Sequence, residues 1–209
     1  PWATFYKNIV LLIFILLLLF TTKYIHPLMQ RNFAKWTTFL SFIAFLYITY
    51  HVLVHLPIID FRPYAIGENI PDGMQATGSE LPQIHDFYLE INEGVNVTED
   101  ILKEDKMMLI VAYNLDNSDR HGFSKIKNVT DEAMKKGFKV YALSASLQDD
   151  FLDIKDEFNL NFEMLFCDET TLKTIIRANP GIVTLKKGTV TGKWNWIDAD
   201  KVFGDQELK

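Results

Sequence analysis

The sequence predicts two membrane-spanning helices followed by an α/β domain with a mainly parallel sheet. Three observations support this. Residues 1–56 contain four basic and no acidic residues around two long apolar runs, and all 27 acidic residues come later. The later part alternates apolar runs typical of buried strands with amphipathic stretches of helical period. A stretch rich in proline and glycine, His55–Met74, separates the two parts.

The first expected membrane helix is centred on Ile9–Phe20, twelve apolar residues without a break. Extended to Thr4–Ile25, it is long enough to cross a hydrocarbon layer of about 30 Å, with Lys7 reaching the interface. The second run, Trp36–Leu56, predicts a helix of about 31 Å. Together they form a helical hairpin, the expected membrane part of residues 1–56.

The orientation of this hairpin follows from its connecting loop. The loop contains Lys23, His26, Arg31 and Lys35 and no acidic residue. Short basic loops remain in the cytoplasm. The domain after the hairpin is therefore expected on the other side, which in a bacterium is the periplasmic side of the cytoplasmic (inner) membrane.

The junction, residues 57–84, is interpreted as a juxtamembrane stalk. Proline removes a donor and disfavours a helix before it, so the second helix should end at His55. Asp60 and Arg62 place charges where the emerging chain meets lipid headgroups. Gly67–Leu81 has the composition of an extended linker. The alternative is a docking surface for another membrane subunit.

His51 and His55 share one helix face near this exit. Contact with headgroups or with the stalk is the simpler interpretation. A metal, haem or quinone contact is the alternative, but such sites need more ligands than one histidine pair. No cofactor or metal is therefore predicted.

Charge excludes one class of partner. The residues after position 56 comprise 17 basic and 27 acidic side chains. Nucleic-acid binding requires a basic surface, so no nucleic-acid partner is expected.

The C-terminal domain, residues 85–209, is expected to begin with a hairpin and a buried strand. His85–Ile91 alternates weakly as a strand does, and Asn92–Gly94 is a turn. Met107–Tyr113 is a continuous apolar run, which suits a central strand buried on both faces. Phe123–Lys136 has apolar residues at helical spacing and a glycine after it, so it predicts the first long helix.

Four further segments continue the alternation of strands and helices. Apolar runs of strand length alternate with amphipathic stretches, and a proline ends the series. The segments are strand Lys139–Ser144, helix Gln148–Phe158, short strand Phe162–Phe166 and helix Thr170–Arg177, before Asn179–Pro180.

The chain closes with an antiparallel hairpin and a helix. Ile182–Lys186 and Thr189–Trp196 flank a Lys-Gly turn, and Asp198–Phe203 starts the helix. Alternating strands and helices form a parallel core, to which the hairpin adds antiparallel strands. This is the element order of a thioredoxin-like fold, and Pro180 stands where that fold keeps its cis-proline.

Three segments resemble a known family: the N-terminal PWATFYKN, Asp60–Met74 and Phe166–Pro180. They are similar to the C-terminal half of bacterial DoxX-family (DoxX or MauE-like) membrane proteins that carry a thioredoxin-like domain. The resemblance implies a four-helix bundle whose N-terminal half precedes this chain. It also implies the neighbourhood of respiratory quinone, thiosulfate or thiol redox chemistry.

Thioredoxin catalysis needs two cysteines at the N-terminus of the first long helix. By spacing from the strand before it, that slot is occupied by Ser118-Asp119-Arg120-His121. Serine cannot form a disulfide and histidine cannot resolve one, so a redox-inactive domain is predicted. A triad of Ser118, Asp119 and His121 is disfavoured because residues so close on one loop rarely align as a relay.

The only cysteine, Cys167, follows the third strand in the sequence FCDET. An apolar-flanked lone cysteine is usually a small buried hydrophobic residue. Asp168 and Glu169 should raise its pKa rather than lower it. A redox-sensing role or a mixed disulfide is the alternative, and it would require an accessible, electropositive site.

These interpretations predict a membrane-anchored accessory subunit that docks on a larger envelope or respiratory complex. The partners expected are the lipid bilayer and other membrane subunits, and no catalytic residue is predicted. One alternative is a component of a thiol or quinone oxidoreductase whose redox residues lie in upstream helices. The other is a periplasmic peptide-binding module, with Asp119, Arg120, His121, Asn179 and Pro180 as its candidate contacts.

Overall fold

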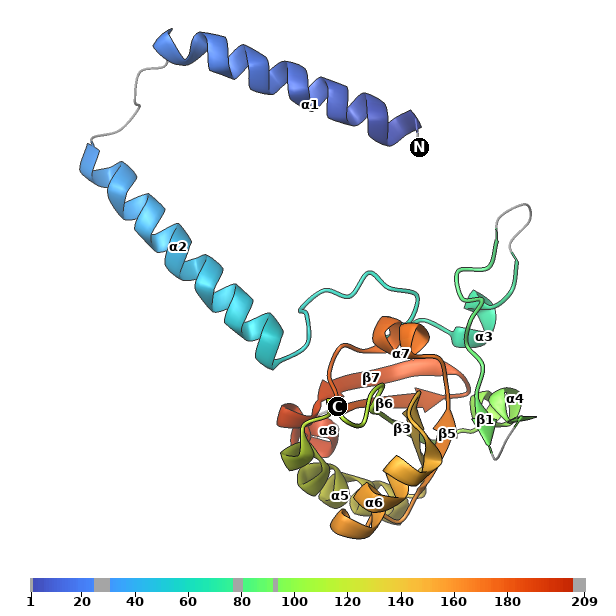
Figure 1. Cartoon of the computed structure of the whole chain (residues 1–209). Coiled ribbons are helices and arrows are strands. Elements are labelled where there is room, and N and C mark those ends of the chain that lie inside the picture. The colour runs from blue at the N-terminus through green and yellow to red at the C-terminus, as the bar shows by residue number, and fades with distance from the viewer. Residues whose placement is uncertain (1, 25–30, 77–80, 92–93, 205–209) are drawn as a thin grey trace. The chain divides into compact units, whose positions relative to one another are not determined.

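The computed structural model describes residues 2–24, 31–76, 81–91 and 94–204 (Figure 1). The chain divides into two compact units, Pro1–Ile48 and Thr49–Lys209. The predicted turn at residues 92–94 lies partly outside the described residues, as do His26 and Ile25 of the predicted membrane hairpin.

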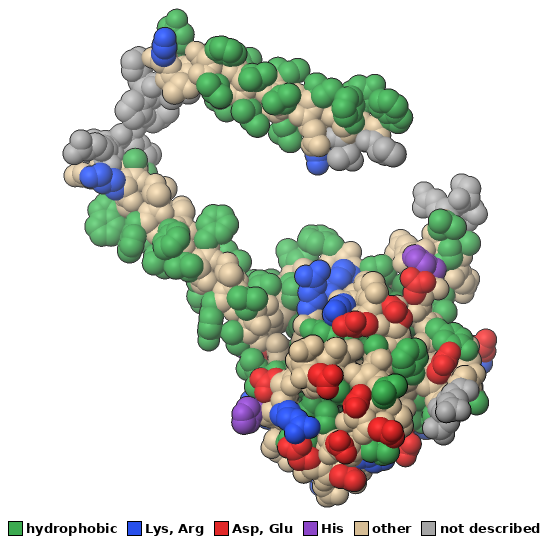
Figure 2. Space-filling view, viewed as in Figure 1, with side chains coloured by type: hydrophobic (Ala, Val, Ile, Leu, Met, Phe, Trp, Pro, Cys, Tyr) green, Lys and Arg blue, Asp and Glu red, His purple; other side chains and the backbone are tan. Residues whose placement is uncertain are grey.

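The first unit is helical. It contains α1 (Trp2–Thr21), the 3-10 turn η1 (Thr22–Tyr24) and most of α2 (Arg31–Val54), which continues into the second unit. Two spans of 20 and 23 residues, Phe5–Tyr24 and Asn32–Val54, are long and apolar enough to cross a membrane. Hydrophobic side chains surround both helices, with none of the span windows buried (Figure 2). The second helix ends at Val54, one residue before the stop expected at His55.

The second unit is built on one mixed sheet. Seven strands, among the described residues, lie in the order β2-β1-β5-β4-β3-β6-β7. β3, β4 and β5 are parallel, whereas β1–β2 and β6–β7 are antiparallel hairpins. The strands are β1 (Glu90–Ile91), β2 (Val95–Asn96), β3 (Met107–Val111), β4 (Lys139–Ser144), β5 (Glu163–Phe166), β6 (Gly181–Lys186) and β7 (Thr189–Asn195).

Helices cover both faces of this sheet, and β3 supplies both cores because all five of its residues are buried. Met108 and Ile110 pack with α5, α6 and α8, and Leu109 packs on the opposite face with α4 and α7. The helices are α3 (Ile70–Gly73), α4 (Thr98–Lys103), α5 (Arg120–Lys135), α6 (Gln148–Phe158), α7 (Glu169–Ile175), η2 (Trp196–Asp198) and α8 (Lys201–Gly204).

The predicted alternation of strands and helices is confirmed, and with it the thioredoxin-like α/β fold. Several details differ. Only the last two residues of the predicted strand His85–Ile91 pair as a strand, while Phe87 and Leu89 are buried in the core. β3 ends at Val111, before the predicted Tyr113, and α5 begins at Arg120, before the predicted Phe123. Helices α3 and α4 were not predicted. The final helix is split into η2 and α8.

Residues 57–69, which we call the strap, follow α2 and precede α3. Within the predicted extended linker Gly67–Leu81, residues Ile70–Gly73 form helix α3 instead, and Gly67–Asn69 pair with the outer edge of β7. The amide of Gly67 donates to the carbonyl of Val190 at 2.8 Å, and the amide of Val190 donates to the carbonyl of Glu68 at 2.9 Å. The strap thus satisfies backbone groups that an edge strand would otherwise expose.

Candidate functional site

The first turn of α5 occupies the place of a thioredoxin dithiol. Asp119 is the N-cap of this helix, and its carboxylate accepts a hydrogen bond from the amide of His121 at 3.0 Å. The hydroxyl of Ser118 donates to the carbonyl of Leu115 at 2.6 Å. Two members of the disfavoured triad, Ser118 and Asp119, therefore bond to the backbone at the helix start.

The loop before α5 is joined to the loop before β6. The Asn179–Pro180 peptide bond is cis, as predicted. The amide of Asp119 donates to the carbonyl of Asn179 at 3.1 Å, and the side chain of Asn179 donates to the carbonyl of Asn114 at 2.8 Å. The structure thus brings the candidate peptide-contact residues of the two loops together.

Arg120 and His121, the other two candidates for peptide contact, are exposed. Arg120 forms an ion pair with Glu157 of α6 at 2.9 Å, and both side chains are about half exposed (60% and 45%). Surface pairs of this kind contribute little to stability. Arg120 and His121 therefore remain on the surface, beside the joined loops that precede α5 and β6.

Gly122 lies at the back of the first turn, in a space filled by two rings. A Cβ atom there would lie 2.9 Å from Cγ of Trp196 and 3.0 Å from Cγ of Pro180. The predicted slot, Ser118-Asp119-Arg120-His121, spans the N-cap Asp119 and the first residues of α5. Gly122 follows it directly, so the back of this turn is packed against Pro180 and Trp196.

Cys167 lies on the other face of the sheet. It belongs to the core with α7, whereas Phe123 of α5 belongs to the opposite core. Its side chain is fully buried, and burial raises the pKa of its thiol to about 12, with Asp168 adding to the rise. The expectation of a small buried residue with a raised pKa is confirmed, although burial rather than the neighbouring acids is the main cause.

The strap carries the other charged candidates, Asp60 and Arg62. Asp60 binds Nζ of Lys193 on β7 at 2.6 Å and Nε of Arg62 at 2.8 Å, and the Lys193 side chain is only 4% exposed. Burial opposes ionisation of Asp60, but hydrogen bonds from Arg62 and Lys193 outweigh it and lower its pKa to about 2. Burial lowers the pKa of Lys193, and Asp60 counteracts this shift. We assign an ion pair, because the Asp60 carboxylate is ionised and in direct contact with the ammonium.

His55 is bound to the domain as well. Its Nδ1 lies 2.6 Å from Oδ2 of Asp198, and the other carboxylate oxygen, Oδ1, accepts a hydrogen bond from Lys201 at 2.7 Å. Burial raises the pKa of Asp198, but the bonds from Lys201 and His55 outweigh this effect and leave it below its usual range. His51 and His55 border a cavity of about 280 Å³ with Trp194. Within the described residues, no group of three or more His, Cys, Asp or Glu could hold a metal ion.

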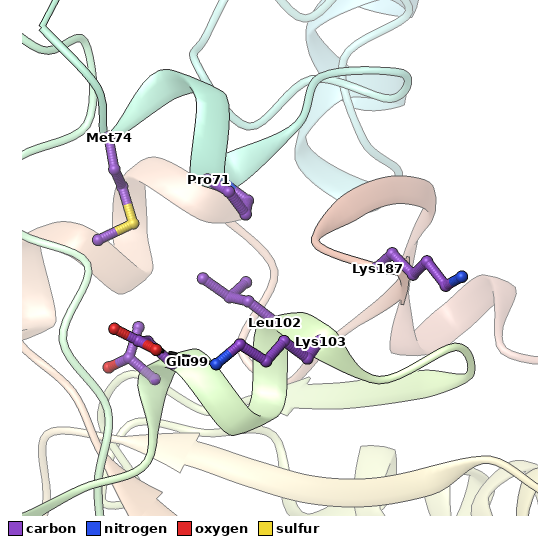
Figure 3. A pocket seen from close by; sticks show the side chains of 7 residues that line it. Pro71, Met74, Glu99, Leu102, Lys103 and Lys187 are labelled. Atoms are coloured by element: carbon purple, nitrogen blue, oxygen red, sulfur yellow. Dashed lines mark hydrogen bonds and ion pairs between the residues drawn. The ribbon is translucent and has the colours of Figure 1, made fainter.

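Another cavity, of about 480 Å³, lies between α3 and α4 (Figure 3). Pro71, Met74 and Leu102 contribute apolar surface to its lining. Lys103 pairs with Glu99 at 2.9 Å along α4, and Lys187 points away from the other labelled side chains (Figure 3). The lining is therefore mainly apolar. The sequence did not reveal this cavity because α4 itself was not predicted.

No family model and no curated protein matches the chain, so the DoxX-family resemblance remains a prediction. Solved structures with similar chains include a thiol:disulfide interchange protein from Bacteroides sp., 14% identical, with 58% of this chain and 83% of that one covered and a TM-score of 0.44. A putative thiol:disulfide interchange protein DsbE from Chlorobium tepidum is 18% identical, with coverages of 59% and 90% and a TM-score of 0.44. A thioredoxin-like protein from Aeropyrum pernix is 13% identical, with coverages of 57% and 89% and a TM-score of 0.45.

Identities this low carry no information about activity. The parallel β3–β4–β5 core, the antiparallel β6–β7 hairpin and the helices on both faces define the fold by themselves. The chain therefore combines two helices that are long and apolar enough to cross a membrane with a thioredoxin-like α/β domain.

Proposed function

We propose that this protein is a membrane-anchored accessory subunit whose thioredoxin-like domain is redox-inactive and docks on a larger envelope or respiratory complex. The observation that supports this most strongly is the first turn of α5. The N-cap there is Asp119, and the space for a second side chain at Gly122 is filled by Pro180 and Trp196. The first turn of α5 therefore packs against Pro180 and Trp196 and carries no cysteine that could react.

Thiol–disulfide exchange requires a thiolate that can reach a substrate disulfide. Cys167 is the only cysteine in residues 1–209. It is fully buried, and burial raises the pKa of its thiol to about 12, so the thiol is protonated near neutral pH. The domain therefore presents neither an attacking nor a resolving thiol, which supports a binding role.

The peptide-binding alternative is less well supported. An extended peptide pairs through main-chain hydrogen bonds with free backbone groups. The carbonyl of Asn179 is already bonded to the amide of Asp119 at 3.1 Å. The two candidate loops bind one another, and this favours docking through a preformed surface.

Membrane anchoring rests on the spans Phe5–Tyr24 and Asn32–Val54. Lys23 and Lys35 flank the connection between them, and no acidic residue occurs before Asp60. By the positive-inside rule, the connection is cytoplasmic. We therefore propose that the domain lies on the periplasmic side of a bacterial inner membrane.

The test is purification of the full-length protein from its own membranes in a mild detergent, with mass spectrometry of the bound proteins. A discrete set of partners in fixed stoichiometry, unchanged by a thiol-blocking reagent, is the expected result. The accessory-subunit proposal would be refuted if the protein eluted alone and its full-length form carried upstream cysteines whose oxidation state changes. It would instead indicate a membrane redox component.

A further inference from the structure

The outward face of the strap is hydrophobic. Ile58, Phe61 and Ile66 are 82%, 91% and 62% exposed, and Ile59 is 64% exposed. Three of them, Ile58, Ile59 and Ile66, line the same hollow, and Phe61 lies between them in the sequence. Large exposed apolar side chains so close together mark an interaction site rather than an ordinary solvated loop.

Contacts on the inner side of the strap fix this orientation. The carboxylate of Asp60 binds Lys193 of β7 at 2.6 Å. Tyr64 is buried in the core, with its ring centroid 6.0 Å from that of Phe87. Phe61 lies between these two anchors in the sequence and is itself 91% exposed. Its exposure is therefore a consequence of how the strap is attached.

The two charged side chains between Ile58 and Ile66, Asp60 and Arg62, are paired with each other and are largely buried. Arg62 binds Asp60 through Nε at 2.8 Å and donates from Nη1 to the carbonyl of Lys173 at 3.2 Å. The outer face from Ile58 to Ile66 can therefore leave water without desolvating an unpaired charge, which would be costly. A soluble stalk would be expected to show the reverse arrangement, with charges outward and apolar residues inward.

The strap also begins close to the end of a candidate membrane span. That span ends at Val54, and Ile58 follows four residues later. A chain extends by at most about 3.6 Å per residue, so Ile58 lies within about 14 Å of the end of the span. The headgroup layer on each side of a bilayer is about 5–7 Å thick. The hydrophobic face therefore starts within reach of the membrane surface.

We propose that the outer face of the strap, carried by Ile58, Ile59, Phe61 and Ile66, lies on the lipid bilayer as an interfacial element. This inference rests on the proposed membrane span of α2. Interfacial segments bury an apolar face at the boundary between headgroups and acyl chains while their polar side remains outside. Ile58, Ile59 and Ile66 line one hollow of about 290 Å³ together with Asp60, Arg62 and Lys193, whose charges are paired with one another. The strap would then hold the domain against the membrane rather than at the end of a free stalk.

The experiment measures the depth of spin labels in the full-length protein, reconstituted in phosphatidylcholine vesicles. The variant is Phe61→Cys, and Leu147→Cys is the matched control, since Leu147 is a large exposed hydrophobic residue on the same domain (74%). Ile43→Cys, inside the span Asn32–Val54, reports on anchoring. The wild type serves as the blank, because its fully buried Cys167 should not react. At each position, the accessibility of the spin label to oxygen, which concentrates in lipid, is compared with its accessibility to a water-soluble nickel complex.

The expected result is an oxygen-to-nickel accessibility ratio several-fold higher for Phe61→Cys than for Leu147→Cys, with Ile43→Cys higher still. Equal ratios at positions 61 and 147, with Ile43→Cys in lipid, would overturn this inference and leave anchoring intact. A label at position 61 that is aqueous in vesicles but shielded in native membranes would also overturn it, because a protein would then cover the strap. An aqueous label at position 43 would refute the span and this inference together.

Discussion

Replacing Asp60 with asparagine should destabilise the domain more than replacing its partner Lys193 with methionine. The asymmetry arises because the two side chains have different second partners. Without Asp60, the ammonium of Lys193, only 4% exposed, keeps one weak contact to the carbonyl of Tyr64 at 3.3 Å. Without Lys193, Asp60 still accepts hydrogen bonds from Arg62 at 2.8 and 3.1 Å.

The magnitudes follow from this geometry. Removing one partner of a buried ion pair costs about 3–5 kcal/mol. The Asp60 side chain is 18% exposed, so water can reach part of the site. For Asp60→Asn we therefore expect a loss of about 2–4 kcal/mol, and for Lys193→Met about 1–2 kcal/mol, closer to the loss of a charged hydrogen bond. The double variant should resemble Lys193→Met, because the uncompensated ammonium is then absent.

The assay is native-state hydrogen exchange of the full-length protein in detergent, followed by mass spectrometry of the buried strand β3. Exchange of a central strand reports the free energy of global opening. A loss of about 2–4 kcal/mol corresponds to exchange about 30- to 700-fold faster. Glu99→Gln, which breaks an exposed pair with Lys103 on α4, is the control and should leave exchange unchanged. Exchange in Asp60→Asn that matches this control, or that is no faster than in Lys193→Met, would contradict the expected asymmetry.

Three further predictions follow from the same contacts. Because the pKa of Asp60 is lowered from 3.8 to about 2, the stability that it contributes should be fully present above about pH 4 and be lost as the pH falls toward 2. Thermal unfolding at several pH values should show this loss in the wild type and a smaller one in Asp60→Asn. Gly122→Ala should destabilise the domain in urea unfolding, because overpacking against Pro180 and Trp196 costs about 1–3 kcal/mol and exceeds a helix-propensity gain of at most about 1 kcal/mol. Gly204→Ala, with open space around its Cβ, is the control. A thiol reagent at neutral pH should leave Cys167 unmodified in the folded protein and modify it fully in denaturant, and rapid labelling of the folded protein would contradict its burial.

The regular elements of the domain could be predicted because local patterns specify them. Helix α6 was predicted with its observed bounds, Gln148–Phe158, since its apolar residues recur at helical spacing. β4 was likewise predicted at Lys139–Ser144. The continuous apolar run of β3 indicated a central strand, and all five residues of this strand are buried. In each case the pattern reflects burial against the sheet or within it.

The strap and α4 could not be predicted, because their structure depends on distant residues. The strap has the proline, glycine and polar composition of a linker, yet Asp60 is bound by a lysine 133 residues later in the chain. The side chains of Asp60 and Arg62 pair on the domain side, whereas Ile58, Ile59 and Ile66 are exposed. A solvated loop usually shows the reverse arrangement. Helix α4 spans only six residues, and its N-cap, Val97, forms no side-chain capping bond. Helices this short depend on tertiary packing.

The apolar strand and the helical period after it placed the slot at residues 118–121, and the N-cap Asp119 and the start of α5 lie within this range. What the sequence did not show is that Trp196 packs against Gly122, directly after the slot. The one available signal was a glycine in the first turn of a long helix, since Gly122 permits the close approach of two rings.

Docking without a thiol is best tested by native mass spectrometry of the complex from membranes that contain either the wild-type protein or only the Cys167→Ala variant. The same partners in the same stoichiometry are expected for both proteins, with or without a reducing agent. Loss of the partners in a folded Cys167→Ala variant, together with their release from the wild type by the reducing agent, would indicate that Cys167 bonds to a partner and would contradict a redox-inactive docking role.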